Sequence, residues 1–394
     1  MTFDRLWSDL APVGRDASTG GYRRFAWSRA DAELREWFAG QALARGLDLV
    51  TDRAGNQWAW WGDPDAHGPG VVIGSHLDSV PDGGAFDGPL GVVSALLALD
   101  ALRASGTRPA RPVAVVNFGD EEGARFGVAC AGSRLLTGAL PPDRALGLRD
   151  GDGTSMAEAM AAGGFDCTRA GRDDETLGRI ACFVELHVEQ GRGLAGLGRP
   201  VAVGTGIWPH GRWRMEFAGE ANHAGTTRLA DRRDPMLGYA AAVLRARELA
   251  GKHGILATCG KVAVEPNGVN AIPSRVRGWL DARGADAGAV RALVAELSDG
   301  CEITEESWTP ATSFDTGLSG RCAAVLGGAP RLASGAGHDA GVLAQAGIAT
   351  AMLFVRNPTG VSHSPAEHAD RDDCLRGVDA LTAVVTDLAG GRPG

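Results

Sequence analysis

The chain has 394 residues, of which 44% are hydrophobic and 22% are charged, and it carries a net charge of −9. This composition is typical of a soluble globular protein that is long enough for two domains. The acidic balance argues against nucleic acid as a partner, and the lack of a long apolar run argues against a membrane span.

The seven cysteines are dispersed along the chain, odd in number and without a CxxC pair. We therefore expect reduced thiols rather than a disulfide framework, and a cytoplasmic location. The first ten residues, MTFDRLWSDL, include two acids and lack the apolar run of a signal peptide, so we expect no export signal there.

The first half of the chain alternates predicted helices with short apolar runs that are typical of buried strands. We expect helices over residues 2–11, 28–46 and 92–102, with Ser28 as the N-cap of the second, and strands over 71–74, 112–118 and 183–187. The three strands lead into a histidine or an acidic group. This pattern predicts an α/β domain with a mixed, mostly parallel sheet flanked by helices, and a site at the carboxyl ends of its strands.

The middle of the chain has a different pattern, because residues 211–218 alternate apolar and polar side chains like a half-exposed strand. Predicted elements follow in the order of a βαββαβ unit: a helix over 234–249, strands over 257–264 and 275–283, and a helix over 289–297. Buried patterns return with a strand over 349–354 and a helix over 370–388. We therefore predict a discontinuous catalytic domain, residues 1–208 and 323–394, with an inserted α+β lid or dimerisation domain over 209–322.

Five possible metal ligands lie in short segments built for a strand end or a tight turn. They are His76, Asp87, Glu122, His187 and His363. Imidazoles and carboxylates in this proportion suit two divalent ions that share one carboxylate, and the pattern predicts metal-assisted hydrolysis. Taken singly, each has a plain structural alternative: a core histidine, a turn aspartate or a solvated acidic loop. Their joint occurrence beside well-placed acids favours the metal site.

Two further acids complete this prediction. Asp78 follows His76 in HLD and is expected to orient the imidazole through a hydrogen bond. Glu121 is next to Glu122, and successive side chains diverge, so that one acid binds metal while the other moves a proton. The bridging ligand is expected to be Asp87, in GGAFDGPLG just before a helix.

Seven ordered motifs give the chain a strong resemblance to a known family. They are GSHLDSVPDGGAFDGPLGV, DEEGARFG, ELHVEQG, GEANHAGTT, PNGVNAIPSRVRGWLDAR, SGAGHDA and GVSHSPAE. They resemble the N-carbamoyl-L-amino acid hydrolase, β-ureidopropionase and allantoate amidohydrolase family, the hydantoinase/carbamoylase branch of the aminoacylase-like metallopeptidases. The resemblance implies the discontinuous two-domain fold, a homodimer formed through the inserted domain, and two metal ions in each subunit. Mixed imidazole and carboxylate donors accept zinc, manganese, cobalt or nickel.

The resemblance also implies roles for individual residues. One ion would bind His76, Asp87 and His187, the other Asp87, Glu122 and His363, and Glu121 would be the general base. His223 looks like a histidine that reaches the neighbouring subunit's site and steadies the oxyanion. Asn270 and Arg283 resemble residues that hold the substrate carboxylate, and the remaining substrate-binding positions are Gln190, His210 and Gly360.

The predicted reaction is hydrolysis of a small ureido or amide substrate that carries a carboxylate, with an N-carbamoyl-L-amino acid as the first choice. Allantoate, β-ureidopropionate and N-acyl or N-formimino amino acids are alternatives. A metal-binding pseudoenzyme or dimeric scaffold is an alternative of another class. The chain departs from the family pattern at four places that we expect to border the substrate: Arg192, residues 208–210, Arg228 and residues 356–359.

Overall fold

The chain folds into two compact units in a computed structural model that describes residues 1–298 and 300–390. One unit comprises Met1–Gly206 with Ser313–Gly394, and the other Ile207–Thr312. Residues 299 and 391–394 fall within the two domains predicted from sequence and lie outside the described part of the chain. The second boundary is ten residues earlier than the predicted one, because helix α12 (Thr316–Val325) packs Leu318 and Cys322 into the core of the first unit.

The first unit is built on one mixed sheet with the strand order β1-β2-β4-β3-β5-β15-β6-β13, and β14 also pairs with β6. Its four central strands, β4, β3, β5 and β15, run parallel, whereas β1 and β2 pair with their neighbours, and β6 with β15, in antiparallel fashion. The strands are β1 (Asp48–Thr51), β2 (Gln57–Trp61), β3 (Gly70–His76), β4 (Val113–Phe118), β5 (Ile180–Val188), β6 (Val201–Ile207), β13 (Thr312–Ser313), β14 (Arg331–Ser334) and β15 (Thr350–Val355). The predicted α/β class and mixed sheet are confirmed.

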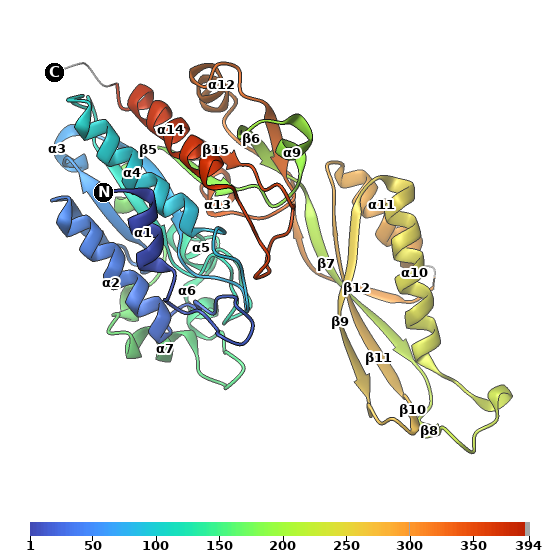
Figure 1. The fold of residues 1–394 in the computed structure, drawn as a ribbon. Helices are drawn as coiled ribbons and strands as arrows, with labels where there is room; N and C mark the ends of the chain where they lie inside the picture. The colour runs from blue at the N-terminus through green and yellow to red at the C-terminus, as the bar shows by residue number, and fades with distance from the viewer. Residues whose placement is uncertain (299, 391–394) are drawn as a thin grey trace. The chain divides into compact units, whose positions relative to one another are not determined.

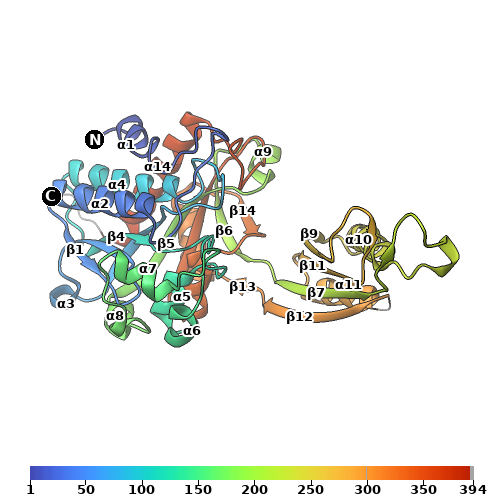
Figure 2. The ribbon, with the colours of Figure 1, turned by 90° about the horizontal axis from the view of Figure 1, so that it is seen from below.

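Helices cover both faces of this sheet, as Figures 1 and 2 show. On one face lie α1 (Phe3–Leu10), α2 (Arg29–Ala44), α4 (Pro89–Ala104) and α14 (Arg371–Leu388); on the other lie α5 (Ala131–Thr137), α6 (Pro142–Leu146), α7 (Met156–Ala162) and α8 (Asp174–Gly178). The first unit also contains α3 (Pro64–His67), η1 (Cys167–Arg169), α9 (Gly193–Leu197) and α13 (Asp339–Gln345). The predicted N-cap Ser28 accepts a hydrogen bond from Asp31 N at the start of α2.

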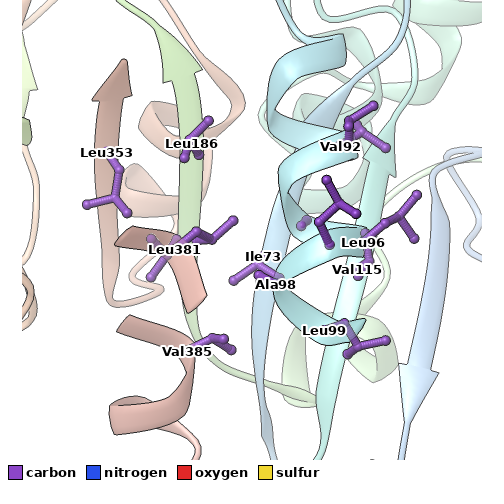
Figure 3. Close-up of a cluster of buried hydrophobic side chains, with 14 of the residues drawn as sticks. Ile73, Val92, Leu96, Ala98, Leu99, Val115, Leu186, Leu353, Leu381 and Val385 are labelled. Carbon is purple, nitrogen blue, oxygen red and sulfur yellow. The ribbon is translucent and has the colours of Figure 1, made fainter. Parts of the chain in front are cut away.

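The central strands of the first unit are unbroken apolar runs in the sequence because both of their faces are buried in the core. Every residue of β3 and β4 is buried, because helices shield both sides of the sheet. Figure 3 shows Val92 and Leu96 of α4, and Leu381 of α14, in a cluster with side chains from β3, β4, β5 and β15. The packed sheet is therefore a rigid base for side chains at its strand ends.

The second unit has the predicted βαββαβ order: β7 (His210–Ala218), α10 (Pro235–His253), β9 (Leu256–Glu265), β11 (Arg275–Arg283), α11 (Ala287–Ser298) and β12 (Glu302–Thr309). Its strands form an antiparallel sheet in the order β12-β7-β11-β9. Helices α10 and α11 pack on one face through Leu249, Val276 and Leu293 (Figure 1). Two short strands, β8 (Asn222–His223) and β10 (Ala271–Ile272), form a separate ribbon near the turn η2 (Leu229–Asp231).

The chain leaves the first unit and returns to it at neighbouring points. Phe314 N donates a hydrogen bond of 3.1 Å to Thr205 O, so the outgoing and returning segments are adjacent in the sheet. Among the described residues, no helix combines the length and apolar character that a membrane crossing requires.

Candidate metal centre and active site

The predicted metal ligands of the first unit gather at the carboxyl ends of its parallel strands. His76 is the last residue of β3, His187 lies one residue before the end of β5, and Glu122 follows β4 closely. His363 lies in the loop after β15. Because these strands are parallel, their carboxyl ends share one edge of the sheet, where open α/β folds place their sites.

Asp87 lies between two groups of side chains. Its Oδ1 is 3.1 Å from His187 Nε2 and 3.5 Å from His76 Nε2. Its Oδ2 is 3.5 Å from His363 Nε2, which in turn is 3.6 Å from Glu122 Oε2. Each group has its donor atoms within 4.8 Å of one another. Asp87 thus offers one oxygen to each group, as a bridging carboxylate must.

The Asp87 loop approaches His76 closely enough to require glycine. Gly88 has a φ of +83°, and a Cβ at this position would lie 2.5 Å from His76 Nδ1. A side chain here would be strained by the backbone and would collide with the ring. The sequence Asp87-Gly88 therefore brings the carboxylate up to the imidazole.

Asp78 holds the acid pair in place through the backbone. Its Oδ1 accepts a hydrogen bond from Glu121 N at 3.2 Å, and its Oδ2 accepts one from Glu122 N at 3.0 Å. The His76 ring is 3.2 Å from Asp78 O through Nδ1, and 3.4 Å from Asp78 Oδ1. The orienting role predicted for Asp78 therefore extends from the imidazole to the loop that carries both glutamates.

Glu121 is buried beside the histidines but outside both ligand groups. Its Oε2 lies 3.9 Å from His76 Nε2, and its Oε1 accepts a hydrogen bond of 3.3 Å from the Cys130 thiol. Only 6% of the residue is exposed. A carboxylate in this position can exchange a proton with a molecule bound at the cluster, and its role as general base stays a prediction.

The pKa shifts of the cluster reflect several acids buried close together. Burial, with Asp87 next, raises the pKa of Glu122 to about 8, and burial raises the pKa of Glu121 well above its usual range. Burial opposes the protonation of His187, but Asp87 outweighs it and raises the pKa to about 9. The acids resist ionisation, and the imidazoles beside them bind protons tightly. A cation bound among these groups would stabilise the ionised carboxylates.

The donor atoms fit divalent ions. The ring nitrogen His76 Nε2 is buried without a hydrogen-bond partner among the described residues, and it faces the Asp87 carboxylate. Tetrahedral ligands about 2.1 Å from an ion lie about 3.4 Å apart, and the histidine nitrogens of both groups lie 3.1–3.6 Å from the carboxylate oxygens. His187 Nδ1 is 2.8 Å from Val188 O, which leaves its Nε2 free to bind.

Two acids flank His187 in the sequence and are hydrogen-bonded to other residues. Glu185 accepts from the Ser75 hydroxyl and from Ala340 N, and Glu189 accepts from Gly193 N and Leu194 N. No role was predicted for His338, whose ring lies 4.6 Å from that of His187 in an edge-to-face contact. Its position in SGAGHDA was the available signal.

Two of the predicted substrate-binding residues belong to the first unit. Gln190 Nε2 donates to Asp87 Oδ2 at 2.8 Å and lies 3.3 Å from His363 Nε2, so its amide borders the cluster. Gly360 has a φ of +71°, and a Cβ there would come within 2.3 Å of Arg192 Cγ. The departure at Arg192 is therefore accommodated by the glycine. Another departure, Arg356, is bound to Asp373 by a 2.7 Å hydrogen bond.

The other substrate-binding candidates belong to the second unit and fall into two pairs. His210 is opposite Arg283 in the register of β7 and β11, and Asn270 precedes Ala271, which pairs with His223 across β10 and β8. His210 and Arg283 lie at the carboxyl end of β11, whereas Asn270 and His223 belong to the ribbon beyond its amino end; the eight steps between the nine residues of β11 extend about 26 Å at about 3.3 Å each. Within one chain, Asn270 and Arg283 therefore lie toward opposite ends of β11, and the role predicted for both at the substrate carboxylate stays a prediction.

The ring of His223 has a defined tautomer. Its Nδ1 accepts a hydrogen bond of 3.0 Å from Gly225 N, so Nε2 carries the hydrogen in the neutral ring. Arg283 donates to both oxygens of Asp281 at 2.8 and 2.6 Å, so its guanidinium is already bound to a carboxylate.

Comparison with known proteins identifies the family. The profile of peptidase family M20/M25/M40 matches residues 72–387. The chain belongs to this family. An N-carbamoyl-L-amino acid amidohydrolase of Geobacillus stearothermophilus is 37% identical over 408 residues, with 99% of each chain covered. An allantoate amidohydrolase of Escherichia coli strain K12 is 32% identical over 400 residues, with 96% of each chain covered.

A solved structure agrees with these relatives. A crystal structure of an amidase of the hydantoinase/carbamoylase family from Burkholderia vietnamiensis has a TM-score of 0.87 and 31% identity, covering 98% of this chain and 97% of that one. The resemblance found in the sequence motifs is confirmed. This M20 family member is a hydrolase that acts on C–N bonds in linear amides.

Proposed function

We propose that the protein hydrolyses an N-carbamoyl-L-α-amino acid to the amino acid, carbon dioxide and ammonia, with two divalent ions in its first unit. The observation that carries the proposal is the shared Asp87, with one carboxylate oxygen toward His76 and His187 and the other toward His363. Zinc, manganese, cobalt and nickel all suit such mixed donors.

The chemistry needs help because a carbamoyl carbon is stabilised by two nitrogens and is a poor electrophile. When bound, the ions supply Lewis acidity toward the carbamoyl oxygen. Glu121 takes a proton from the attacking water and passes it to the leaving nitrogen. The Nε2–H of His223 is a suitable donor to the oxyanion of the tetrahedral intermediate.

Recognition of the substrate carboxylate is assigned to Arg283, whose planar fork can hold both oxygens. In the structure the Arg283 guanidinium donates to the Asp281 carboxylate. A substrate carboxylate would take the place of the Asp281 carboxylate as the acceptor. His210, opposite Arg283, belongs to the same end of the second unit. In the first unit, Gln190 borders the metal cluster and Gly360 lies against Arg192.

The two pairs in the second unit support a homodimer. One small substrate cannot touch both ends of a strand about 26 Å long, so His223 and Asn270 would act on a different subunit's substrate from Arg283. The surface suits such an assembly: β9 is an edge strand with Leu256 56% exposed, and α10 exposes Leu237 and Leu244. The cytoplasmic location remains a prediction from the dispersed cysteines.

Allantoate hydrolysis is the second candidate, because an allantoate amidohydrolase is 32% identical over nearly the whole chain. β-Ureidopropionate and N-acyl or N-formimino amino acids are further members of the same substrate class. A pseudoenzyme is disfavoured, since all five predicted ligands and Glu121 are present in the chain.

A substrate panel tests the proposal. The protein, loaded separately with each of the four divalent ions, is assayed for ammonia and for free amino acid with N-carbamoyl, N-formyl and N-acetyl amino acids, β-ureidopropionate and allantoate. We expect the highest kcat/KM with an N-carbamoyl-L-amino acid, and equal amounts of ammonia and amino acid. A higher kcat/KM with allantoate would replace the proposal by its alternative.

A further inference from the structure

Glu367 joins the loop that carries Asp87 to the loop that carries His363. Its Oε2 accepts hydrogen bonds from Phe86 N at 2.9 Å and from Asp87 N at 3.0 Å, across some 280 residues of sequence. Its Oε1 lies 3.4 Å from the Ser362 hydroxyl. The residue is 5% exposed, so these bonds form away from bulk water.

The Ser362 hydroxyl extends this connection to the carboxylate of Asp87. It lies 3.3 Å from Asp87 Oδ2, and because it has one hydrogen, it donates either to Asp87 or to Glu367. The residue next to His363 therefore contacts both the bridging carboxylate and the glutamate that holds its backbone.

The second ligand group needs such a connection more than the first. His76 and His187 lie within strands, where the sheet ladder fixes the backbone. His363 lies in a loop, has a left-handed φ of +54°, and exposes 50% of its side chain. Its distance from Asp87 depends on how two loops are held together.

The Glu367 side chain packs against Gly84, where a larger residue would not fit. A Cβ on Gly84 would lie 2.2 Å from Glu367 Oε2 and 2.4 Å from Glu367 Cβ. Since the Cβ of Glu367 is itself in the way, turning the end of the side chain would not relieve the contact. The glycine allows the glutamate to reach Phe86 N and Asp87 N.

We propose that Glu367 is a positioning residue for the ion site formed by Asp87, Glu122 and His363, and that it acts as a hydrogen-bond acceptor joining the two loops. The inference rests on the proposed two-ion function and extends it to a residue outside both ligand groups. The other site, at His76 and His187, depends less on Glu367 because its histidines are held by strands.

Direct ion binding tests the inference without an activity assay. Metal-free protein is titrated with Mn²⁺ or Co²⁺ by calorimetry, which gives the number of ions and their affinities. For wild type we expect two ions. For Glu367→Ala we expect one ion to bind as in wild type and the other on the order of 10- to 100-fold more weakly, the usual effect of losing a partner that orients a ligand.

A conservative variant separates geometry from charge. In Glu367→Gln the amide oxygen can still accept from Phe86 N and Asp87 N, and the amide nitrogen can donate to Ser362, so we expect both affinities to stay near those of wild type. Asp173→Ala is the matched control: Asp173 also accepts a backbone hydrogen bond, from Thr176 N, and a hydroxyl bond, but before the opposite end of β5 from His187. It should keep both affinities while the melting temperature falls.

The outcomes distinguish the two proposals. Wild-type protein that binds fewer than two ions overturns the proposed function. Two ions in wild type, with the same two affinities in Glu367→Ala, overturn the role of Glu367 alone, as does a Glu367→Gln protein that binds as weakly as the alanine variant. If Glu367→Ala does not fold, Gly84→Ala decides: selective weakening of one ion supports the inference, and unchanged affinities overturn it.

Discussion

The thiol of Cys130 donates a hydrogen bond of 3.3 Å to Oε1 of Glu121. The same residues are joined a second time, because Cys130 N donates to Glu121 O at 2.5 Å. Cys130 adopts a left-handed backbone with a φ of 55° at the start of α5. A buried thiol thus holds one oxygen of the carboxylate assigned to proton transfer.

Replacing Cys130 by alanine should lower kcat by about two- to tenfold with little change in KM, because one hydrogen bond is worth about 0.5–1.5 kcal/mol. Steady-state kinetics measures both constants. Cys130→Ser, which keeps a donor, should recover most of the rate. If the alanine and serine variants lose the same activity, the thiol does not act through its hydrogen bond to Glu121.

Glu121→Gln should lower kcat by roughly 10²- to 10⁴-fold, the usual contribution of a general base. The amide has nearly the same shape and its backbone bond to Asp78 is kept, so two ions should still bind. Turnover and ion content are measured on the same sample. Retention of more than a few per cent of activity would remove Glu121 from the proposed mechanism.

Removing divalent ions should abolish activity reversibly and lower the melting temperature. A ligand that binds only the folded protein stabilises it by about 2.7 kcal/mol at one hundred times its Kd. Thermal unfolding before and after chelation, and after adding back Mn²⁺ or Zn²⁺, measures both effects. Full activity in a preparation shown by elemental analysis to lack metal would contradict the two-ion proposal.

Mixing two inactive variants should restore activity if His223 serves the neighbouring subunit. In mixed dimers of Glu121→Gln and His223→Ala, one site keeps Glu121 from one chain and His223 from the other. Random re-association should therefore return roughly a quarter of wild-type activity, since half of the dimers are mixed and each has one intact site.

The matched control for this experiment mixes Glu121→Gln with a chain that carries both substitutions, which leaves no intact site. Lack of recovery in dimers verified as mixed would show that His223 does not act across subunits.

Asp52 should make stability depend on pH. Burial raises its pKa from 3.8 to about 6, although Asn56, Trp58 and Ala54 donate hydrogen bonds to it. The folded state therefore holds this proton more tightly than the unfolded state, and the free energy of unfolding falls as pH rises from about 4 to about 6.

The effect of Asp52 is at most about 3 kcal/mol, because each tenfold difference in proton affinity between the folded and unfolded states corresponds to about 1.4 kcal/mol. Urea unfolding across pH 4–7 measures it. Asp52→Asn should be less stable throughout, because it loses an acceptor, but it should lack this part of the pH dependence. Equal slopes in the two proteins would refute the assignment to Asp52.

Much of the first unit could be predicted because the apolar runs of its strands and the candidate metal ligands lie in the same short segments. The strand that ends at His76 and the one that contains His187 were predicted from local sequence, and parallel strands bring such ends together. Asp87 could be predicted as a bridge from the glycines around it. The sequence motifs alone sufficed for the family.

Contacts between distant segments could not be predicted in this way. Nothing near Cys130 or Glu367 in the sequence indicates that one contacts Glu121 and the other Asp87, since both contacts depend on how loops fold back over the sheet. The separation of Asn270 from Arg283 likewise depends on the register of β11 against β7, which places Arg283 opposite His210. Local patterns give element type, whereas register and loop packing come from the assembled fold.

The backbone hydrogen bond between Phe314 and Thr205 bears on whether the second unit can be deleted from the chain. Since the two crossing points of the backbone are neighbours, a short turn could close the gap and excise the whole insert. Such a shortened chain would retain the five candidate metal ligands and lose Arg283 and His223. The candidate ion ligands therefore all belong to one sheet domain, whereas Arg283 and His223 belong to a segment that enters and leaves it at a single place.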